Sequence, residues 1–266
     1  MNPQRASVAR RLANLLSRLR WLSPLAGGFI PALWLILRMR SAPDDLHRIA
    51  FAGRTIVFRG ADVMVLREVL ADQEYSFLAP FLERIPLPRI LDVGAHIGTF
   101  AAVCRSYAPG AQVLSVEADP DTFEVLQLNS QAWGGTKGGW QVAHAAAGAE
   151  DGVLLRLDTA GPTMSHRVSP TGQVDVRSLG LSSLVARCAA DTGMVDLAKI
   201  DIEGSEEAFI CAAPEVLHRI RAIVVELHPS LCDVDRVRKT LQAYFPAIRE
   251  IGGRVSSKPL LFCQRN

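Results

Sequence analysis

The chain has 266 residues, of which 49% are apolar, 21% charged and 6% aromatic, and this length fits one large domain or a domain with an appendage. The charged fraction argues against a disordered chain, and the low aromatic content argues against a protein that stacks single-stranded bases. The net charge of +2 conceals an asymmetry, because residues 1–43 contain seven arginines and no acid, whereas the rest has 22 basic and 27 acidic residues. The body of the chain is therefore mildly acidic, and no nucleic-acid partner is expected.

Residues 1–45 are predicted to form a basic and apolar helical arm ahead of a main domain at 46–266. Leucines recur at helical spacing over residues 12–19, and residues 21–37 carry no charge before Arg38 and Arg40. That run is at the short limit for a membrane span and contains two prolines and two glycines. Three interpretations stay open: helices packed on the domain or lying at a membrane surface, a spanning segment, and a cleaved signal peptide. Arginines beside tryptophans favour an interfacial helix, so we expect peripheral membrane contact through this arm.

The five cysteines are odd in number and include no CxxC pair. This pattern predicts free thiols in a reducing compartment, which indicates the cytoplasm, and it disfavours a structural zinc site.

Apolar strands alternate with amphipathic helices in the rest of the chain. Strands are expected at 54–59, 89–93, 112–117, 140–146, 153–158, 173–177, 197–202 and 222–226. Helices are expected at 75–84, after the glycine turn up to 107, and at 120–131, 181–190, from 205, and 233–244. Two final strands, 247–251 and 259–264, are expected to form a hairpin. The alternation predicts a Rossmann-like α/β fold, a mostly parallel sheet with an antiparallel C-terminal edge hairpin and with ligands at the carboxyl ends of its strands.

The most informative segment is ILDVGAHIGTF at residues 90–100, where Asp92 ends a strand and Gly94 and Gly98 follow. Gly94 is expected to let the backbone approach a ligand, and Gly98 to begin the next helix where a side chain would collide, at the border of an open cleft. The spacing differs from the dinucleotide fingerprint G-x-G-x-x-G, and no phosphate-loop G-K-[ST] is present. An ordinary tight turn is the alternative.

The next strand ends at Glu117, 25 residues after Asp92. A carboxylate at this place can accept hydrogen bonds from both hydroxyls of a ribose. It can also be a partner of the helix dipole, since Asp119 and Glu124 crowd the same helix start. Together with the glycine turn, a ribose-binding acid without a phosphate loop favours S-adenosylmethionine as the ligand.

A third group of polar residues lies in KIDIEG, at residues 199–204. Strand alternation places Lys199, Asp201 and Glu203 on one side, where three charges are costly unless they serve each other or a ligand. The strand that ends in VVELH brings Glu226 and His228 to the same edge. A buried ion-pair cluster that braces the site is the alternative to catalysis.

The segments DVGAHIGTF, VEADP, KIDIEGSE and VVELH, in this order, resemble the FkbM family of S-adenosylmethionine-dependent methyltransferases over roughly residues 50–265. The resemblance implies a class I methyltransferase sheet and methyl transfer to a hydroxyl of a sugar, glycan or natural product. It implies cofactor contacts at Asp92, Gly94, Ala95, Gly98 and Glu117. Where the family often has an acid, this chain has Gly180, which leaves the capping of the following helix and one cofactor contact open.

Methyl transfer to a hydroxyl needs its proton removed, and His228, Glu203 and Asp201 are the candidate bases, with Lys199 holding the carboxylates in place. Two acids two residues apart can alternatively hold a divalent metal that acidifies the hydroxyl. A nicotinamide-dependent reductase is contradicted by the glycine spacing. A membrane-tethered nucleoside-binding module would explain the arm but not the polar cluster.

Overall fold

A computed structural model describes residues 3–252 and 258–265, and the chain divides into two units between Glu74 and Tyr75. The sequence-based boundary after residue 45 falls inside the first unit and stays a prediction. All five cysteines are free.

The first unit begins with two helices, α1 (Pro3–Ala26) and α2 (Phe29–Ser41). Gly27 and Gly28 between them have φ angles of +81° and +132°, which glycine adopts at little cost, and the helix axes bend by 113° there. Among the described residues, no single helix is long and apolar enough to cross a membrane. Residues Leu12–Ala26 and Phe29–Ser41 meet that test of length and composition only as a bent pair.

A hairpin follows, formed by β1 (His47–Phe51) and β2 (Arg54–Phe58), and then the short turns η1 (Gly60–Asp62), α3 (Val63–Val65) and the π-helical η2 (Leu66–Ala71). The sequence predicted β2 but not β1. His47 of β1 is polar but buried, and Ala50 is apolar but exposed, so the sequence does not alternate between apolar and polar residues as the burial does.

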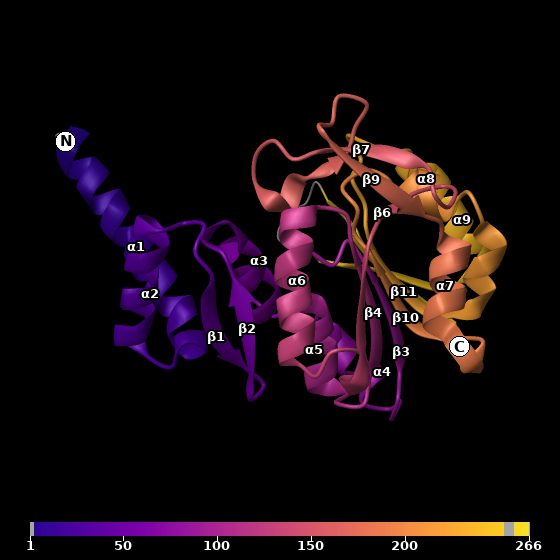
Figure 1. Ribbon diagram of the computed structural model, residues 1–266, viewed down its shortest axis with the longest axis horizontal. Helices are drawn as coiled ribbons and strands as arrows, with labels where there is room; N and C mark the ends of the chain where they lie inside the picture. The colour runs from indigo at the N-terminus through magenta and orange to yellow at the C-terminus, as the bar shows by residue number, and fades with distance from the viewer. Residues whose placement is uncertain (1–2, 253–257, 266) are drawn as a thin grey trace. The chain divides into compact units, whose positions relative to one another are not determined.

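The second unit is built on a seven-stranded sheet (Figure 1). Its strands are β3 (Arg89–Val93), β4 (Gln112–Glu117), β5 (Trp140–His144), β10 (Val195–Ile200), β11 (Ile220–Glu226), β12 (Ala247–Ile251) and β13 (Leu260–Gln264). The order is β12-β13-β11-β10-β3-β4-β5. The five strands from β11 to β5 are parallel, and β13 and β12 are antiparallel. The predicted class I α/β sheet and its edge hairpin are confirmed; residues 253–257 of the predicted hairpin loop lie outside the described residues.

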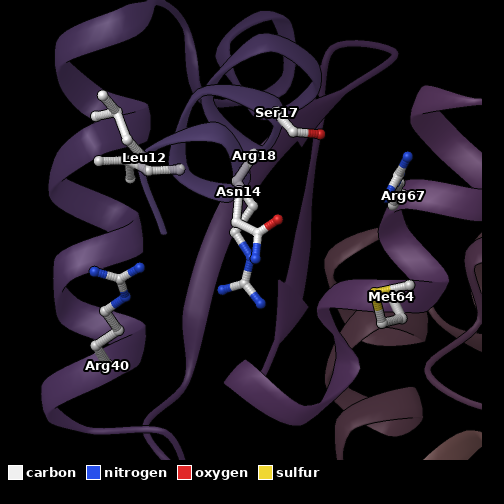
Figure 2. A pocket seen from close by; sticks show the side chains of 8 residues that line it. Leu12, Asn14, Ser17, Arg18, Arg40, Met64 and Arg67 are labelled. Carbon is white, nitrogen blue, oxygen red and sulfur yellow. The ribbon is translucent and has the colours of Figure 1, made fainter. Parts of the chain in front are cut away.

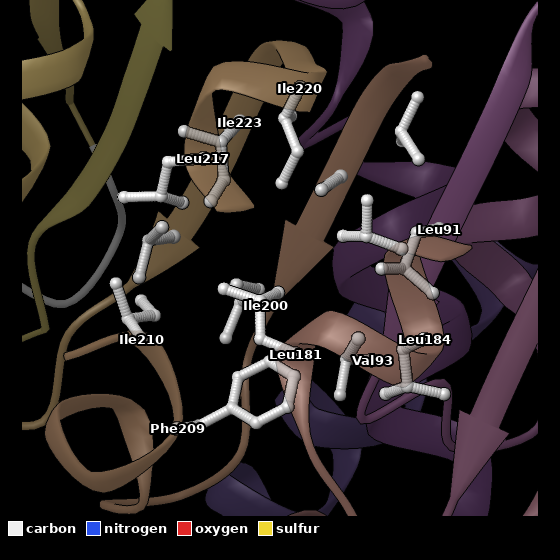
Figure 3. Packing of buried hydrophobic residues seen from close by; sticks show 14 of the residues in the cluster. Leu91, Val93, Leu181, Leu184, Ile200, Phe209, Ile210, Leu217, Ile220 and Ile223 are labelled. Atoms are coloured by element: carbon white, nitrogen blue, oxygen red, sulfur yellow. The ribbon is translucent and has the colours of Figure 1, made fainter. Parts of the chain in front are cut away.

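Helices cover both faces of this sheet, with α5 (Thr99–Tyr107) and α6 (Pro120–Ala132) on one side in Figure 1. Helices α7 (Leu181–Ala189), α8 (Glu206–Ile210) and α9 (Val234–Tyr244) lie on the other. Figure 3 shows the core beneath this second layer, where Leu91, Ile200 and Ile223 of the strands face Leu184 and Phe209 of the helices. Alternation along the strands therefore turns the intervening residues toward the α5 and α6 side.

The helix expected at 75–84 is instead the turn η3 (Ser76–Leu78) followed by α4 (Ala79–Leu82). Pro80 lies in the first turn of α4, and because proline has no N–H it cannot continue a helix that begins before it.

A separate four-stranded sheet lies beyond β5, in the order β6-β9-β7-β8. Its strands are β6 (Ala146–Ala147), β7 (Leu154–Asp158), β8 (Arg167–Val168) and β9 (Val174–Leu179), and the turn η5 (Thr163–Ser165) joins β7 to β8. The remaining turns are η4 (Thr136–Gly138), η6 (Ala190–Thr192) and η7 (Pro214–Arg219).

Candidate active site

The register of the sheet aligns polar residues of three neighbouring strands. Lys199 of β10 is level with Asp92 of β3, and Asp92 is level with Ser115 of β4. All three side chains are buried, and the Ser115 hydroxyl donates a hydrogen bond of 3.2 Å to Asp92 Oδ2. Sequence reasoning missed Ser115, because only the register reveals that it faces Asp92.

Lys199 joins the glycine turn to the segment that follows β10. Its Nζ donates to the Gly94 carbonyl at 2.6 Å and lies 3.3 Å from Asp201 Oδ2 and 3.9 Å from Asp92 Oδ1. Burial disfavours the charge on Lys199, but Asp201 and Asp92 outweigh it and raise the pKa of the ammonium. Burial raises the pKa of Asp92 to about 6, although the Lys199 charge opposes that shift. This lysine is therefore a charged bridge between the two groups of candidate residues.

The two glycines of the turn both have left-handed backbone, with φ of +74° at Gly94 and +87° at Gly98. A Cβ at Gly94 would lie 1.7 Å from the Asp201 carbonyl oxygen, so only glycine lets the turn approach the end of β10 this closely. A Cβ at Gly98 would lie 2.6 Å from the Trp140 ring and 2.8 Å from Leu126. The expectation that Gly98 borders an open cleft is therefore wrong, because this position packs against the core.

Glu117 is tied to the glycine turn by backbone hydrogen bonds. Its Oε2 accepts from the His96 N–H at 2.8 Å, and its Oε1 accepts from Ala118 and Asp119 at 2.9 Å each. Burial raises the pKa of Glu117, although the hydrogen bonds from the N–H groups of Asp119 and His96 act to lower it. The N–H groups of Gly94 and Ala95 both donate to the Val116 carbonyl, so in this arrangement they hold the turn to β4.

Asp119, rather than Glu117, caps helix α6. Its side chain accepts from the Thr122 N–H at 2.7 Å, which satisfies a free donor of the first turn. The helix-start alternative for Glu117 loses its main support, because a better placed carboxylate already occupies that role.

The segment between β7 and β8 contacts the glycine turn and the start of α6 through one histidine bond each. His166 Nδ1 lies 2.8 Å from Asp119 Oδ2, and His96 Nε2 lies 3.0 Å from the Thr163 hydroxyl. Burial opposes ionisation of Asp119, but His166 and the Thr122 N–H outweigh it and lower the pKa of Asp119 to about 2. The hydrogen bond to Asp119 raises the pKa of His166. These contacts had no signal in the sequence, since His166 lies 47 residues from Asp119.

The third group forms just beyond the ends of β10 and β11. Strand β10 ends at Ile200, two residues earlier than expected, so Asp201 and Glu203 lie in a turn and not on a strand face. Glu203 has a φ of +48°, an unfavourable conformation for a side-chain-bearing residue that is often found at functional sites. One ligand atom each from Asp201, Glu203 and His228 lie within 4.8 Å of one another. The structure thus brings the three candidates together, but through the segment that follows β10 and not through alternation along a strand.

A fully buried carboxylate, Glu206, positions this cluster. Its Oε1 lies 2.8 Å from His228 Nδ1 and accepts from the Gly204 N–H at 3.1 Å and the Ile202 N–H at 3.3 Å. On the other side of the ring, His228 Nε2 lies 3.2 Å from Glu203 Oε2. Burial opposes charge on the ring, but Glu203 and Glu206 outweigh it and raise the pKa of His228 to about 10. In this arrangement the two carboxylates favour the charged form of the ring.

Lys258 is a second positive charge at the cluster. Its Nζ lies 2.9 Å from Glu203 Oε1 and 3.6 Å from Glu226 Oε1. Sequence reasoning missed both Lys258 and Glu206 as site residues. Glu206 was visible as the last acid of KIDIEGSE, whereas Lys258 stood in a segment expected to be a plain hairpin loop.

Helix α7 begins at Gly180, where the family often has an acid, and a distant residue supplies the carboxylate. The Gly180 N–H donates to Asp151 Oδ1 at 2.7 Å, and the Ser183 hydroxyl donates to Asp151 Oδ2. Hydrogen bonds from Ser183 and Gly180 lower the pKa of Asp151. The open question of how this helix is capped is therefore answered by Asp151.

Comparison with known proteins agrees with this architecture. A family model described as "Methyltransferase FkbM domain" matches residues 92–250. A curated relative, the hexuronic acid methyltransferase AglP of Haloferax volcanii, is 25% identical over 198 residues, which cover 73% of this chain and 79% of that protein. The crystal structure of methyltransferase FkbM from Methylobacillus flagellatus KT is similar in fold, with a TM-score of 0.50 and 16% identity over 67% of this chain, and this chain spans 44% of that one.

The family match decides between the enzyme classes that the sequence left open. It favours methyl transfer over a nicotinamide-dependent reductase and over a binding module without activity. Because the matched segment covers more than half of the residues and contains Asp92, Glu117, Asp201, Glu203 and His228, the chain belongs to the FkbM family of S-adenosylmethionine-dependent methyltransferases.

Proposed function

We propose that this protein O-methylates a hydroxyl group of a sugar or glycan. The single observation that carries the proposal is the cluster of Asp201, Glu203 and His228, beyond two adjacent parallel strands. Reacting groups of α/β enzymes lie at this edge of the sheet. The name of the relative from Haloferax volcanii, a hexuronic acid methyltransferase, supports a sugar acceptor.

Asp92, Gly94, Ala95, Gly98 and Glu117 are the residues proposed to hold S-adenosylmethionine. Asp92 fits this role, because its Oδ1 is buried without a hydrogen-bond partner among the described residues and an ionised carboxylate suits the ammonium of the cofactor. Glu117 Oε2 accepts one backbone hydrogen bond and keeps acceptor capacity, which suits a ribose hydroxyl. When bound, the cofactor supplies an electrophilic methyl group.

Asp201, Glu203 and His228 are proposed to hold a divalent cation that lowers the pKa of the acceptor hydroxyl. Two carboxylates and an imidazole are ligands of this kind of cation, and their ligand atoms already converge within 4.8 Å. The alternative is general-base catalysis by His228. Glu206 would then hold the imidazole in position through Nδ1 and leave Nε2 to face the hydroxyl.

The cofactor is tested first, separately from the acceptor. Adenosylmethionine at about 100 times its dissociation constant should stabilise the fold by about 2.7 kcal/mol. Glu117→Ala should weaken binding ten- to a hundredfold, since charge-assisted hydrogen bonds contribute about 1.5–3 kcal/mol. Unchanged affinity in calorimetry would return Glu117 to a purely structural role.

Activity is then measured as the amount of S-adenosylhomocysteine formed, with uronic acids and neutral glycans as acceptors. If a cation does the work, chelator should stop the wild-type enzyme and Asp201→Asn and Glu203→Gln should lose activity. If His228 is the base, His228→Ala should lower turnover about 10²–10⁴-fold while chelator has no effect. Glu215→Gln, on an acid of the turn η7 with no ligand role here, is the matched control. Wild-type rates in all three site variants would mean that this cluster is structural.

A further inference from the structure

Helix α2 of the N-terminal unit carries an exposed apolar face. Ile30, Trp34 and Leu37 are 74%, 66% and 51% exposed, and their spacing of four and three residues puts them on one side of the helix. Ala32, Ile36 and Met39 form the buried side. Because isolated exposed apolar residues are common but a row of this size is not, the face indicates a contact with something outside the unit.

The charged residues of the helices α1 and α2 are all arginines. Arg38 and Arg40 lie in the last turn of α2, and Arg18 and Arg20 lie on α1, while residues 1–43 contain no acid. An apolar helix face flanked by arginines matches an anionic lipid surface, because the apolar side chains enter the bilayer and the guanidinium groups stay among the headgroups. A second copy of this chain would instead place the same arginines against one another.

An open cavity of about 820 Å³ lies within the same unit and is lined by Arg18, Arg40 and Arg67. Leu12, Leu15 and Met64 supply its apolar wall. Figure 2 shows Arg40 and Arg67 on opposite sides of the view with Arg18 between them. Arg67 Nε lies 3.3 Å from Asp72 Oδ2, whereas the guanidinium groups of Arg18 and Arg40 make no hydrogen bond or ion pair with the residues that the structure describes.

The cavity and the apolar face are continuous along α2. Arg40 stands three residues after Leu37, so the two side chains are neighbours on the helix surface. Guanidinium groups bind phosphate oxygens in pairs of charge-assisted hydrogen bonds. Two arginines without partners, an apolar wall and an adjoining apolar face together match the headgroup and first chain carbons of an anionic phospholipid.

We propose that the N-terminal unit docks on anionic lipid bilayers, with Ile30, Trp34 and Leu37 among the lipid chains and with Arg18 and Arg40 holding a lipid phosphate in the cavity. This docking does not depend on the methyl-transfer chemistry, so each can fail without the other.

The charge component is tested by flotation of the full chain with vesicles. It should float with phosphatidylcholine vesicles that contain about one third phosphatidylglycerol and stay behind with phosphatidylcholine alone. Each arginine at such a surface contributes about fivefold, the equivalent of about 1 kcal/mol, so the double variant Arg18→Gln/Arg40→Gln should bind about thirtyfold more weakly. Arg187→Gln, at an exposed arginine of α7, is the matched control and should bind as the wild type does.

The insertion component is tested through Trp34. Its fluorescence should be quenched by lipids with brominated chains, and Trp34→Leu should keep vesicle binding while losing that quenching. Trp34→Glu should lose binding, whereas Leu154→Glu, at a residue of β7 that is 57% exposed, should not. Thermal melting of each variant checks that it is folded.

Five results would overturn the proposal. These are equal binding to neutral and anionic vesicles, unchanged binding of Arg18→Gln/Arg40→Gln, and persistence of quenching in Trp34→Leu. The fourth is displacement from vesicles by inorganic phosphate at constant ionic strength, which would assign the cavity to a soluble phosphate. A dimer that Trp34→Glu dissociates without changing vesicle binding would likewise assign the face to a second copy.

Discussion

Replacing Glu206 by glutamine isolates the buried hydrogen bond that holds the cluster together. Glutamine has nearly the same shape and can still accept from the Gly204 and Ile202 N–H groups, but it cannot neutralise the charge of His228. The bond of 2.8 Å between His228 Nδ1 and Glu206 Oε1 lies in a fully buried place. A hydrogen bond between charged groups contributes about 1.5–3 kcal/mol, and for a unit of this size each kcal/mol lowers the melting temperature by about 2–4 °C. We therefore expect Glu206→Gln to melt about 3–12 °C below the wild type.

Glu207→Gln is the matched control, one residue along the same helix. Glu207 pairs with Arg236 at 2.7 Å, but the arginine side chain is 61% exposed, and such surface pairs contribute about 0–1 kcal/mol. Its melting temperature should therefore fall by less than about 4 °C. Both variants are compared by calorimetry with chelator present, so that no cation replaces the proton of His228.

The pH dependence gives a second measurement of the same bond. The pKa of His228 is raised from an ordinary 6.5 to about 10, so its stabilisation is complete below pH 6.5 and is lost as the pH rises through about 10. The difference between wild type and Glu206→Gln should therefore be largest below pH 6.5, shrink as the pH rises from there to about 10, and be smallest above it. A variant that melts together with the wild type, or a difference that persists above pH 10, would refute the reasoning.

Three further predictions follow from other contacts. Gly98→Ala should lose about 1–3 kcal/mol in urea unfolding, because its Cβ would lie 2.6 Å from the Trp140 ring; wild-type stability would contradict the packing. The pKa of Asp119 is lowered to about 2 and that of His166 is raised above 6.5, so their pair is strongest between the ordinary pKa values of the two groups. His166→Gln should therefore differ from wild type most near pH 5 and least in alkali, and a difference that grows with pH would exclude the ion pair. Because burial raises the pKa of Asp92 to about 6, calorimetric affinity for adenosylmethionine should rise as the pH rises through 6, and Asp92→Asn should remove that rise.

Local sequence patterns were sufficient for most elements of the main sheet. The strands Arg89–Val93 and Gln112–Glu117 begin and end where expected, because short apolar runs there are bounded by proline or glycine turns. The C-terminal hairpin and the order of the motifs also followed from the sequence. The helix expected at 75–84 is wrong, because Pro80 cannot lie in the interior of a helix. The prediction gave the spacing of the apolar residues more weight than this property of proline.

The sequence by itself determined the fold class, the family and which segments contain the candidate site residues. Only the tertiary structure decided the partners of those segments, because strand register and helix packing bring together residues with no local relation. Lys199 faces Asp92 across 107 positions of chain, as the register of β10 on β3 requires. Lys258 reaches Glu203 across 55 residues, and Asp151 caps α7 from 29 residues away. Glu206 was visible in KIDIEGSE, but its bond to His228 depends on where α8 lies relative to the residues after β11, and no pattern along the chain encodes that distance.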